Sequence, residues 1–175
     1  AAETLSTRLA TTVDRVETRA QAALKSNQRP RTAVLDWTDP PLRAGHWITE
    51  MIERAGGDAS FQPEHASEPV EWSRLTRYDP EVLVVAPCGF TIERARDAVD
   101  ELRGHDGWRD LTAVENGTVY VADGNALFNR PSHRLVESLQ VLQWCMYPEI
   151  TEIDDAVRTA VRRVGASSRP TDRTA

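Results

Sequence analysis

The sequence predicts an α/β fold in which helices cover both faces of a mainly parallel sheet. Short apolar segments at residues 31–36, 81–86 and 118–122 alternate with longer segments that each carry one apolar stripe. Such alternation is typical of parallel strands joined by crossover helices. Segment 81–86, EVLVVA, is a nearly continuous apolar run, which indicates a strand buried on both faces. A chain of 175 residues with 40% hydrophobic residues can bury one such core and carry an added helix.

Residues 3–25 are predicted to form one long amphipathic helix that ends in the polar segment before Pro30. Apolar residues recur there at steps of three and four. They are Leu5, Leu9, Val13, Val16, Ala20 and Leu24. Because this helix precedes the first strand, its apolar stripe must pack on this domain or bridge to another one.

The remaining elements follow from the glycines, prolines and polar turns between them. Helices are predicted at 44–55, 71–76, 91–102, 131–147 and 150–164, with a further short strand at 59–61. We therefore divide the chain into a helix at 1–29, an α/β lobe at 30–149, a C-terminal helix at 150–164 and a disordered tail at 165–175.

Composition excludes some classes of protein and leaves others open. The net charge of −6, from 27 acidic and 21 basic residues, argues against a nucleic-acid partner, because phosphate binding needs a basic face. No apolar run approaches the roughly 20 residues of a membrane span. The opening residues do not resemble a signal segment, so we expect a mature or trimmed chain or a cytoplasmic protein. Lys25 is the only lysine, which suits either a high-salt environment or a GC-rich genome.

Three loops that follow predicted strands are the candidate binding site, because ligands of parallel sheets bind outside the carboxyl ends of the strands. The loops lie at residues 37–42, 87–90 and 125–131. Each combines an aromatic residue with polar atoms and with Gly or Pro. This mixture suits a large, partly apolar ligand that carries amides. Stiff turns plugged by their own side chains are the alternative.

Signals for catalysis are weak. The sequence contains no nucleophile elbow, phosphate loop, zinc-protease motif or dinucleotide fingerprint. Cys88 could act as a nucleophile with His133 as its base, but we favour a small residue packed in a turn. Asp36, Asp39 and Asp123 could form a carboxylate cluster at the strand ends, or serve as turn and capping residues.

The cysteines and histidines show no metal-binding pattern. Cys88 and Cys145 are 57 positions apart, which is not a zinc spacing, and we do not expect a disulfide between them. The four histidines likewise show no metal spacing.

At the three loops the sequence resembles the cobalamin-binding branch of the periplasmic substrate-binding proteins that serve ABC importers of cobalamin and iron siderophores. The resemblance runs from Arg31 to about Glu149. The matching blocks, in order, are AVLDWTDPP, AGHW, VEW, DPEVLVVAPCGF and NGTVYVADGNALFNRP.

In that family a long rigid helix joins two α/β lobes, and the ligand lies between them. The resemblance therefore implies that residues 3–25 are the connector helix and that this chain lacks an N-terminal lobe. It also implies an extracytoplasmic protein, periplasmic or anchored at the cell surface, without enzyme activity. Such a protein delivers cobalamin or a related corrinoid to permease subunits, and the corrinoid is its transported ligand rather than a cofactor.

The resemblance also implies which residues face the corrinoid. They are Trp37, Thr38, Asp39, Pro40, Leu42, Ser67, Cys88, Gly89, Phe90, Asn125, Leu127, Phe128, Asn129 and Arg130. Leu42 and the Ser67 region stand where relatives often place aromatic residues. Ser73 stands at a glutamate that docks on transporter arginines, so the nearby Glu68 and Glu71 are the candidate docking residues.

The resemblance leaves the contact to cobalt open. His65 and His133 are conceivable axial ligands of the cobalt. In this family, packing and hydrogen bonds usually hold the ligand, so we do not expect cobalt coordination.

Other functions remain to be weighed. A ferric-siderophore or heme-binding protein of the same superfamily would need a basic pocket, for which Arg43 and Arg130 are the obvious candidates. Neutral amide partners are more plentiful, which favours a corrinoid. A small hydrolase that uses Cys88 belongs to a different class. A stand-alone domain that dimerises through residues 3–25 is a third hypothesis.

Overall fold

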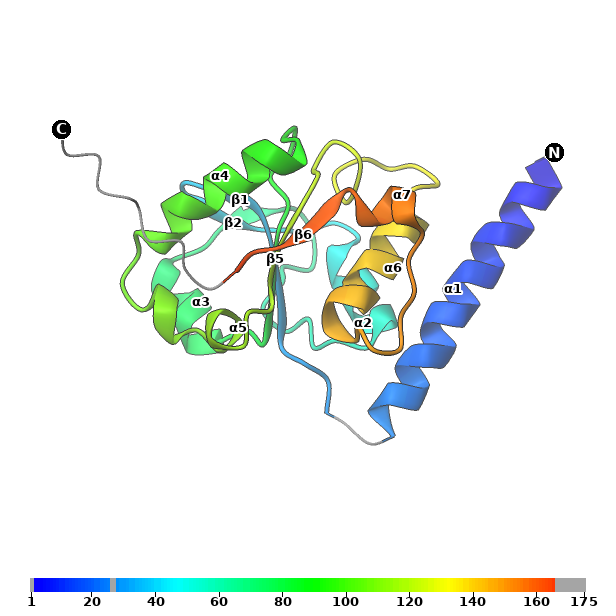
Figure 1. Cartoon of the computed structure of the whole chain (residues 1–175), viewed down its shortest axis with the longest axis horizontal. Helices are drawn as coiled ribbons and strands as arrows, with labels where there is room; N and C mark the ends of the chain where they lie inside the picture. The colour runs from blue at the N-terminus through cyan, green and yellow to red at the C-terminus, as the bar shows by residue number, and fades with distance from the viewer. Residues whose placement is uncertain (1, 26–27, 166–175) are drawn as a thin grey trace.

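The computed structural model describes residues 2–25 and 28–165, and its centre is a six-stranded sheet with the strand order β3-β2-β1-β4-β5-β6 (Figure 1). The central strands, which run parallel, are β1 (Thr32–Thr38), β4 (Val82–Val85) and β5 (Val119–Ala122). The outer strands, which pair antiparallel, are β2 (Pro41–Arg43), β3 (Glu68–Pro69) and β6 (Val161–Arg163). The predicted α/β fold is confirmed, whereas the antiparallel edges were not expected.

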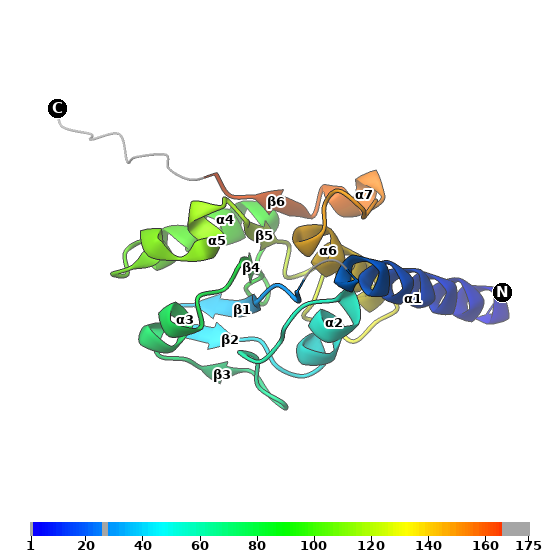
Figure 2. The same ribbon diagram turned by 90° about the horizontal axis from the view of Figure 1, so that it is seen from below.

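Helices cover both faces of the sheet (Figures 1 and 2). On one face lie α1 (Ala2–Leu24), α2 (Ile48–Ala55), α6 (Leu135–Met146) and α7 (Asp155–Arg158). On the other lie α3 (Trp72–Tyr78), α4 (Ile92–Arg103), the 3-10 helix η1 (Trp108–Asp110) and α5 (Thr112–Glu115).

Strand β4 shows why the sheet needs two helical layers. Val82 and Val84 pack into the core beneath α1, α2 and α6. Leu83 and Val85 pack into the opposite core beneath α4 and α5. Side chains alternate between the faces of a strand, so the apolar run read from the sequence is buried on both sides.

Helix α1 is fastened to the lobe through its C-terminal half only. Val16 and Ala20 are buried against α2 and α6, and Gln143 of α6 donates its amide to the carbonyl oxygen of Val16 at 2.7 Å. Toward the N-terminus Leu9 is half-buried and Leu5 is 46% exposed, as the helix extends past the lobe (Figure 1). Neither this helix nor any other in the described residues has the apolar length that a membrane crossing needs.

The side chain of Gln62 takes the place of a strand beside β1. The strand predicted at 59–61 is wrong, because the chain makes one bridge, from Asp58 to Arg31, and then turns. The buried Gln62 amide accepts the N–H of Val34 at 3.2 Å and donates to the carbonyls of Val34 and Ala44 at 3.0 and 2.7 Å. One amide therefore satisfies the edge of β1 where β2 does not reach it.

The helix predicted at 150–164 is also wrong. Only α7 is helical in that range, and β6 then pairs with β5, with the N–H of Val164 donating to the carbonyl of Val119 at 2.8 Å. Val161 and Val164 are both buried but belong to the cores on opposite faces of the sheet. Positions three apart share one face of a helix but lie on opposite faces of a strand, so burial of both selects the strand. Residues 166–175 of the predicted disordered tail lie outside the described residues.

We expect Gln62→Glu to lower the free energy of unfolding by about 3 kcal/mol or more at neutral pH, because it aims a buried carboxylate at two carbonyl oxygens. Gln62→Met, which removes the hydrogen bonds without adding charge, should cost about 1–3 kcal/mol. Urea unfolding measures both. Gln21→Glu, on the exposed side of α1, is the control and should unfold like the wild type; a Gln62→Glu variant as stable as the wild type would contradict the role of Gln62.

Candidate functional site

The three loops predicted to bind ligand lie together at the carboxyl ends of β1, β4 and β5, because these strands are parallel. We call this end of the sheet its carboxyl edge. Figure 1 shows the loops after β4 and β5 at the top of the view. Hydrogen bonds join neighbouring loops: the N–H of Cys88 donates to the carbonyl of Asp36 at 3.1 Å, and the Asn129 amide donates to the carbonyl of Ala86 at 2.9 Å. The edge is therefore one connected surface.

The loops after β4 and β5 are in very close contact. A Cβ at Gly124 would overlap the carbonyl oxygen of Pro87, so this position admits only glycine. The Asn125 amide donates to the carbonyl of Gly89 at 3.1 Å, and the Asn129 amide also donates to the carbonyl of Gly124 at 3.2 Å. Both asparagines, which we predicted as ligand contacts, thus fasten the two loops to each other.

Phe128 is held in an uncommon backbone conformation, with φ of 65°. Its N–H donates to the hydroxyl of Ser138 at 2.9 Å, and its carbonyl accepts the indole N–H of Trp47 at 2.7 Å. The side chains of Leu127 and Phe128 are each 2% exposed and pack in the core, so they support the loop from below. Sequence reasoning missed the roles of Ser138 and Trp47, because neither lies in the loop that it supports. Ser138 is 10 positions from Phe128, on α6, and Trp47 is 81 positions from it, before α2.

An aromatic pair joins the end of β1 to the loop after β4. The rings of Trp37 and Phe90 meet edge to face with centroids 5.1 Å apart, and the guanidinium carbon of Arg94 lies 3.7 Å from the centre of the Phe90 ring. The Trp37 indole donates to the carbonyl of Asp39 at 3.0 Å, which keeps the turn closed. Trp37 is partly buried and Asp39 is exposed, so a ligand could reach this turn.

The other predicted residues differ in exposure. Thr38 is buried, with its hydroxyl donating to Glu101 of α4. Leu42 is half-buried in β2. Phe90, which was predicted to face the ligand, is buried in the core. The exposed residues of the predicted set are Asp39, Pro40, Cys88, Gly89, Asn125 and Arg130.

A cavity of about 200 Å³ opens between the loops and the start of α2. The residues that line it are Asp36, Ala44, Gly45, His46, Trp47, Ile48, Ser67, Cys88, Phe128 and Asn129. Ser67, Cys88, Phe128 and Asn129 were predicted site residues, and this cavity brings them together. His46 and Trp47 were not predicted, although the AGHW block that contains them was part of the resemblance.

Asp36 is the charged group of this cavity that is most enclosed. Burial raises the pKa of its carboxyl group, while the Ser67 hydroxyl, which donates to Oδ2, and the nearby His46 both act to lower it. The Ser67 oxygen in turn accepts the N–H of Gly45 at 3.0 Å, so the orientation of the hydroxyl is set.

The three carboxylates that could have clustered at the strand ends have different surroundings. Asp36 lines the cavity, whereas Asp39 and Asp123 do not. Asp123 accepts the N–H groups of Asn125 and Ala126 at 2.9 Å each. Asp123 is therefore a turn-capping residue, the alternative that the sequence left open.

The structure does not bring the predicted pair, Cys88 and His133, together around this cavity. Cys88 lines the cavity, but the exposed His133 is not among the lining residues. Both cysteines are free thiols, as expected. Within residues 2–25 and 28–165, no group of three or more His, Cys, Asp and Glu side chains is arranged to hold a metal ion.

The predicted docking glutamates differ in their surroundings. Glu68 forms an ion pair with Arg43, a buried guanidinium that also donates to the carbonyl of Phe61. Burial, followed by the charge of Arg74, lowers the pKa of Arg43. Glu71 is exposed at the start of α3.

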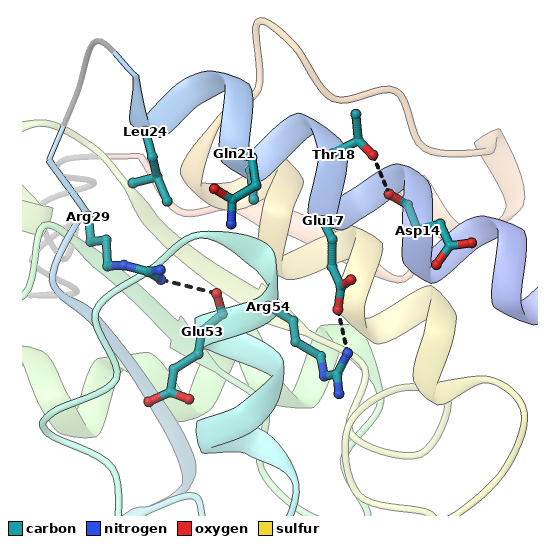
Figure 3. Close-up of a pocket in the computed structure, with 9 residues that line it drawn as sticks. Asp14, Glu17, Thr18, Gln21, Leu24, Arg29, Glu53 and Arg54 are labelled. Atoms are coloured by element: carbon teal, nitrogen blue, oxygen red, sulfur yellow. Dashed lines mark hydrogen bonds and ion pairs between the residues drawn. The ribbon is translucent and has the colours of Figure 1, made fainter.

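A larger, shallow hollow of about 540 Å³ lies between α1 and α2, away from the three loops (Figure 3). Arg54 of α2 pairs there with Glu17 of α1, and Arg29 donates to the carbonyl of Glu53 at 3.1 Å. Because these charged groups are paired with one another, we interpret the hollow as part of the attachment of α1 rather than as the ligand site.

Comparison with known proteins matches this lobe to a family. A family model described as periplasmic binding protein matches residues 1–126. A comparison with curated proteins found no match.

Solved structures share the fold. A periplasmic heme-binding protein from Pseudomonas aeruginosa superposes with a TM-score of 0.72 at 23% identity, covering 87% of this chain and 55% of that one. The TroA-like protein FepB from Veillonella parvula gives 0.72 at 19% identity, covering 90% and 50%. The vitamin B12 binding protein BtuF of Vibrio cholerae gives 0.59 at 20% identity, covering 79% and 50%. The chain thus spans about half the length of each.

We expect iodoacetamide to modify Cys88 and spare Cys145 in the native protein. Cys88 is exposed, whereas Cys145 is 1% exposed and burial raises the pKa of its thiol, which leaves little reactive thiolate. Peptide mapping by mass spectrometry should find one adduct in buffer and two in guanidinium. Cys88→Ser is the control and should give no adduct in buffer. Rapid labelling of Cys145 in the native protein would contradict its burial in the core.

Proposed function

The chain belongs to the periplasmic binding protein family, and on that premise we propose that it forms the C-terminal half of a substrate-binding protein that delivers cobalamin or a related corrinoid to an ABC importer. Members of this family are binding proteins, and we propose that this chain likewise binds its ligand without catalysis. We further propose an extracytoplasmic location, in the periplasm or anchored at the cell surface.

The observation that carries the proposal is the mixture of surfaces at the carboxyl edge of the sheet. Trp37 offers partly exposed aromatic surface, with the buried Phe90 packed against it, and the Asp36 cavity offers polar atoms. A corrinoid presents a flat ring with amide-bearing arms, which suits this combination of aromatic cover and hydrogen bonding. Of the two arginines considered for an anionic ligand, Arg43 is buried in its pair with Glu68.

We propose that an N-terminal lobe completes the site. The chain spans about half the length of the solved structures that share its fold. The apolar stripe of α1 continues to Leu9 and Leu5 beyond the part that packs on this lobe. A second lobe, or a second copy of this chain, would cover these leucines.

A heme or ferric-siderophore ligand is the second candidate. It is favoured by the superpositions on the heme-binding protein and on FepB, which are better than that on BtuF. All three structures are below 25% identity to this chain, so they support the fold more than the ligand. The chemistry of the loops is therefore our reason for preferring a corrinoid.

Cyanocobalamin should quench the tryptophan emission of this chain saturably, because Trp37 and Trp47 lie at the proposed site. Affinity should rise at least about a hundredfold in a two-lobed version, since the second lobe adds contacts at high effective concentration. Fluorescence titration and calorimetry measure both. Trp37→Phe should lose part of the quenching, while the control Trp72→Phe, on α3, should keep it. Hemin or ferrichrome binding by a two-lobed version that ignores corrinoids would contradict the proposal and support the second candidate.

We expect Glu71→Arg to reduce uptake of labelled cyanocobalamin on the order of tenfold, because like charges at a docking surface are repulsive. Its ligand affinity should not change, since Glu71 does not line the cavity. Glu68→Gln should act more weakly, because Arg43 already pairs with that carboxylate. Glu115→Arg, exposed on α5, is the control. Unchanged uptake in both glutamate variants would rule out this docking surface.

A further inference from the structure

Asp36, which lines the cavity beside β1, carries a buried hydrogen-bond acceptor that has no partner. Oδ1 of Asp36 is enclosed and accepts no hydrogen bond, although Oδ2 is bonded to Ser67. An enclosed oxygen without a donor is costly, and such atoms in native proteins usually mark a functional or hydrated position. Asp36 therefore has an acceptor that a donor from a ligand could satisfy.

Three donors around the cavity are already committed to other hydrogen bonds. The Trp47 indole donates to the Phe128 carbonyl at 2.7 Å, and the Asn129 amide donates to the carbonyls of Ala86 and Gly124. The backbone N–H of Gly45 donates to Ser67 at 3.0 Å. The loop structure depends on each of these bonds.

Two ionisable neighbours bear on the charge of Asp36. Burial raises the pKa of Asp36, while the hydroxyl of Ser67 and the nearby His46, which lines the cavity, favour the charged carboxylate. Cys88 is the other ionisable group in the lining. In its ionised form Asp36 has two oxygens that only accept hydrogen bonds.

We propose that this cavity receives one carboxamide arm of the ligand, and that the amide N–H of the arm donates to Oδ1 of Asp36. The inference rests on the proposed corrinoid function and adds to it the residue that selects the arm. The cavity volume of about 200 Å³ is well above the ~15 Å³ that one water needs by this measure, and so has room for a propionamide.

The same geometry disfavours a carboxylate arm. A propionate of heme, or an acidic siderophore arm, would bring a second negative charge to an enclosed acceptor that is already unpaired. Like charges brought together at an interface are strongly unfavourable, and a site built for a donor rejects ligands that lack one. Asp36 is therefore a specificity-determining residue for amide over acid.

A matched set of corrinoids tests this inference. The b-, d- and e-monocarboxylic acids of cyanocobalamin each replace one propionamide by a propionate. Calorimetry compares each with cyanocobalamin on the wild type, on Asp36→Asn and on the control Asp97→Asn, which changes an exposed carboxylate on α4. Thermal unfolding monitors the fold of each variant.

The wild type should bind one of the three acids at least about tenfold more weakly than cyanocobalamin. Asp36→Asn, whose amide can donate to a carboxylate, should reduce that ratio to about threefold or less. Asp97→Asn should keep the wild-type ratio. The wild-type comparison stands by itself if the Asp36→Asn variant does not fold.

Equal binding of cyanocobalamin and all three acids by the wild type would overturn the inference and leave the proposed function intact. An unchanged ratio in a folded Asp36→Asn variant would also overturn it. Absence of cyanocobalamin binding, by this chain and by a two-lobed version, would overturn the proposed function and the inference together.

Discussion

The parallel pairing of β1, β4 and β5 is the constraint on which the rest of this structure depends. Parallel strands must be joined by crossovers, and these crossovers place helices on both faces and bury the central strand between two cores. The same pairing brings three loops, from distant parts of the sequence, to one edge. The position of the candidate binding surface is thus a direct result of strand direction, whereas its side chains determine which ligand it suits.

Much of this fold could be predicted from apolar periodicity alone. The unbroken apolar run of Val82–Val85 and the regular apolar stripe of Ala2–Leu24 are clear patterns, so local sequence determines the strand and the helix. The edge strands could not be found in this way. Glu68–Pro69 is exposed and two residues long, and Val161–Arg163 is a strand because β5 offers it an open edge. Gln62 shows the limit most clearly, because its role beside β1 depends entirely on contacts distant in sequence.

The candidate site was predictable as loops but not as a cavity. Aromatic and polar residues after each strand indicated the carboxyl ends of the strands as the candidate site. Asp36 and Asp123 both follow an apolar strand segment, yet Oδ1 of Asp36 has no hydrogen-bond donor whereas Oδ1 of Asp123 has one nearby. Asp123 finds its donors within two or three residues of itself, whereas Asp36 depends on a serine 31 positions away. Ser138 was missed for the same reason, since its bond to Phe128 crosses from α6 to a loop.

The one-sided attachment of α1 has a mechanical consequence. The helix contains 23 residues, or about 35 Å at 1.5 Å each, and its firm contacts begin near Val16. The segment from there to Leu5 is a lever of about 16 Å. A tilt of about 5° at the attachment moves the free end by about 1.4 Å, half the length of a hydrogen bond. The angular stiffness of the Val16–Gln143 and Glu17–Arg54 contacts thereby sets how accurately anything carried on that end can be aligned with the loops.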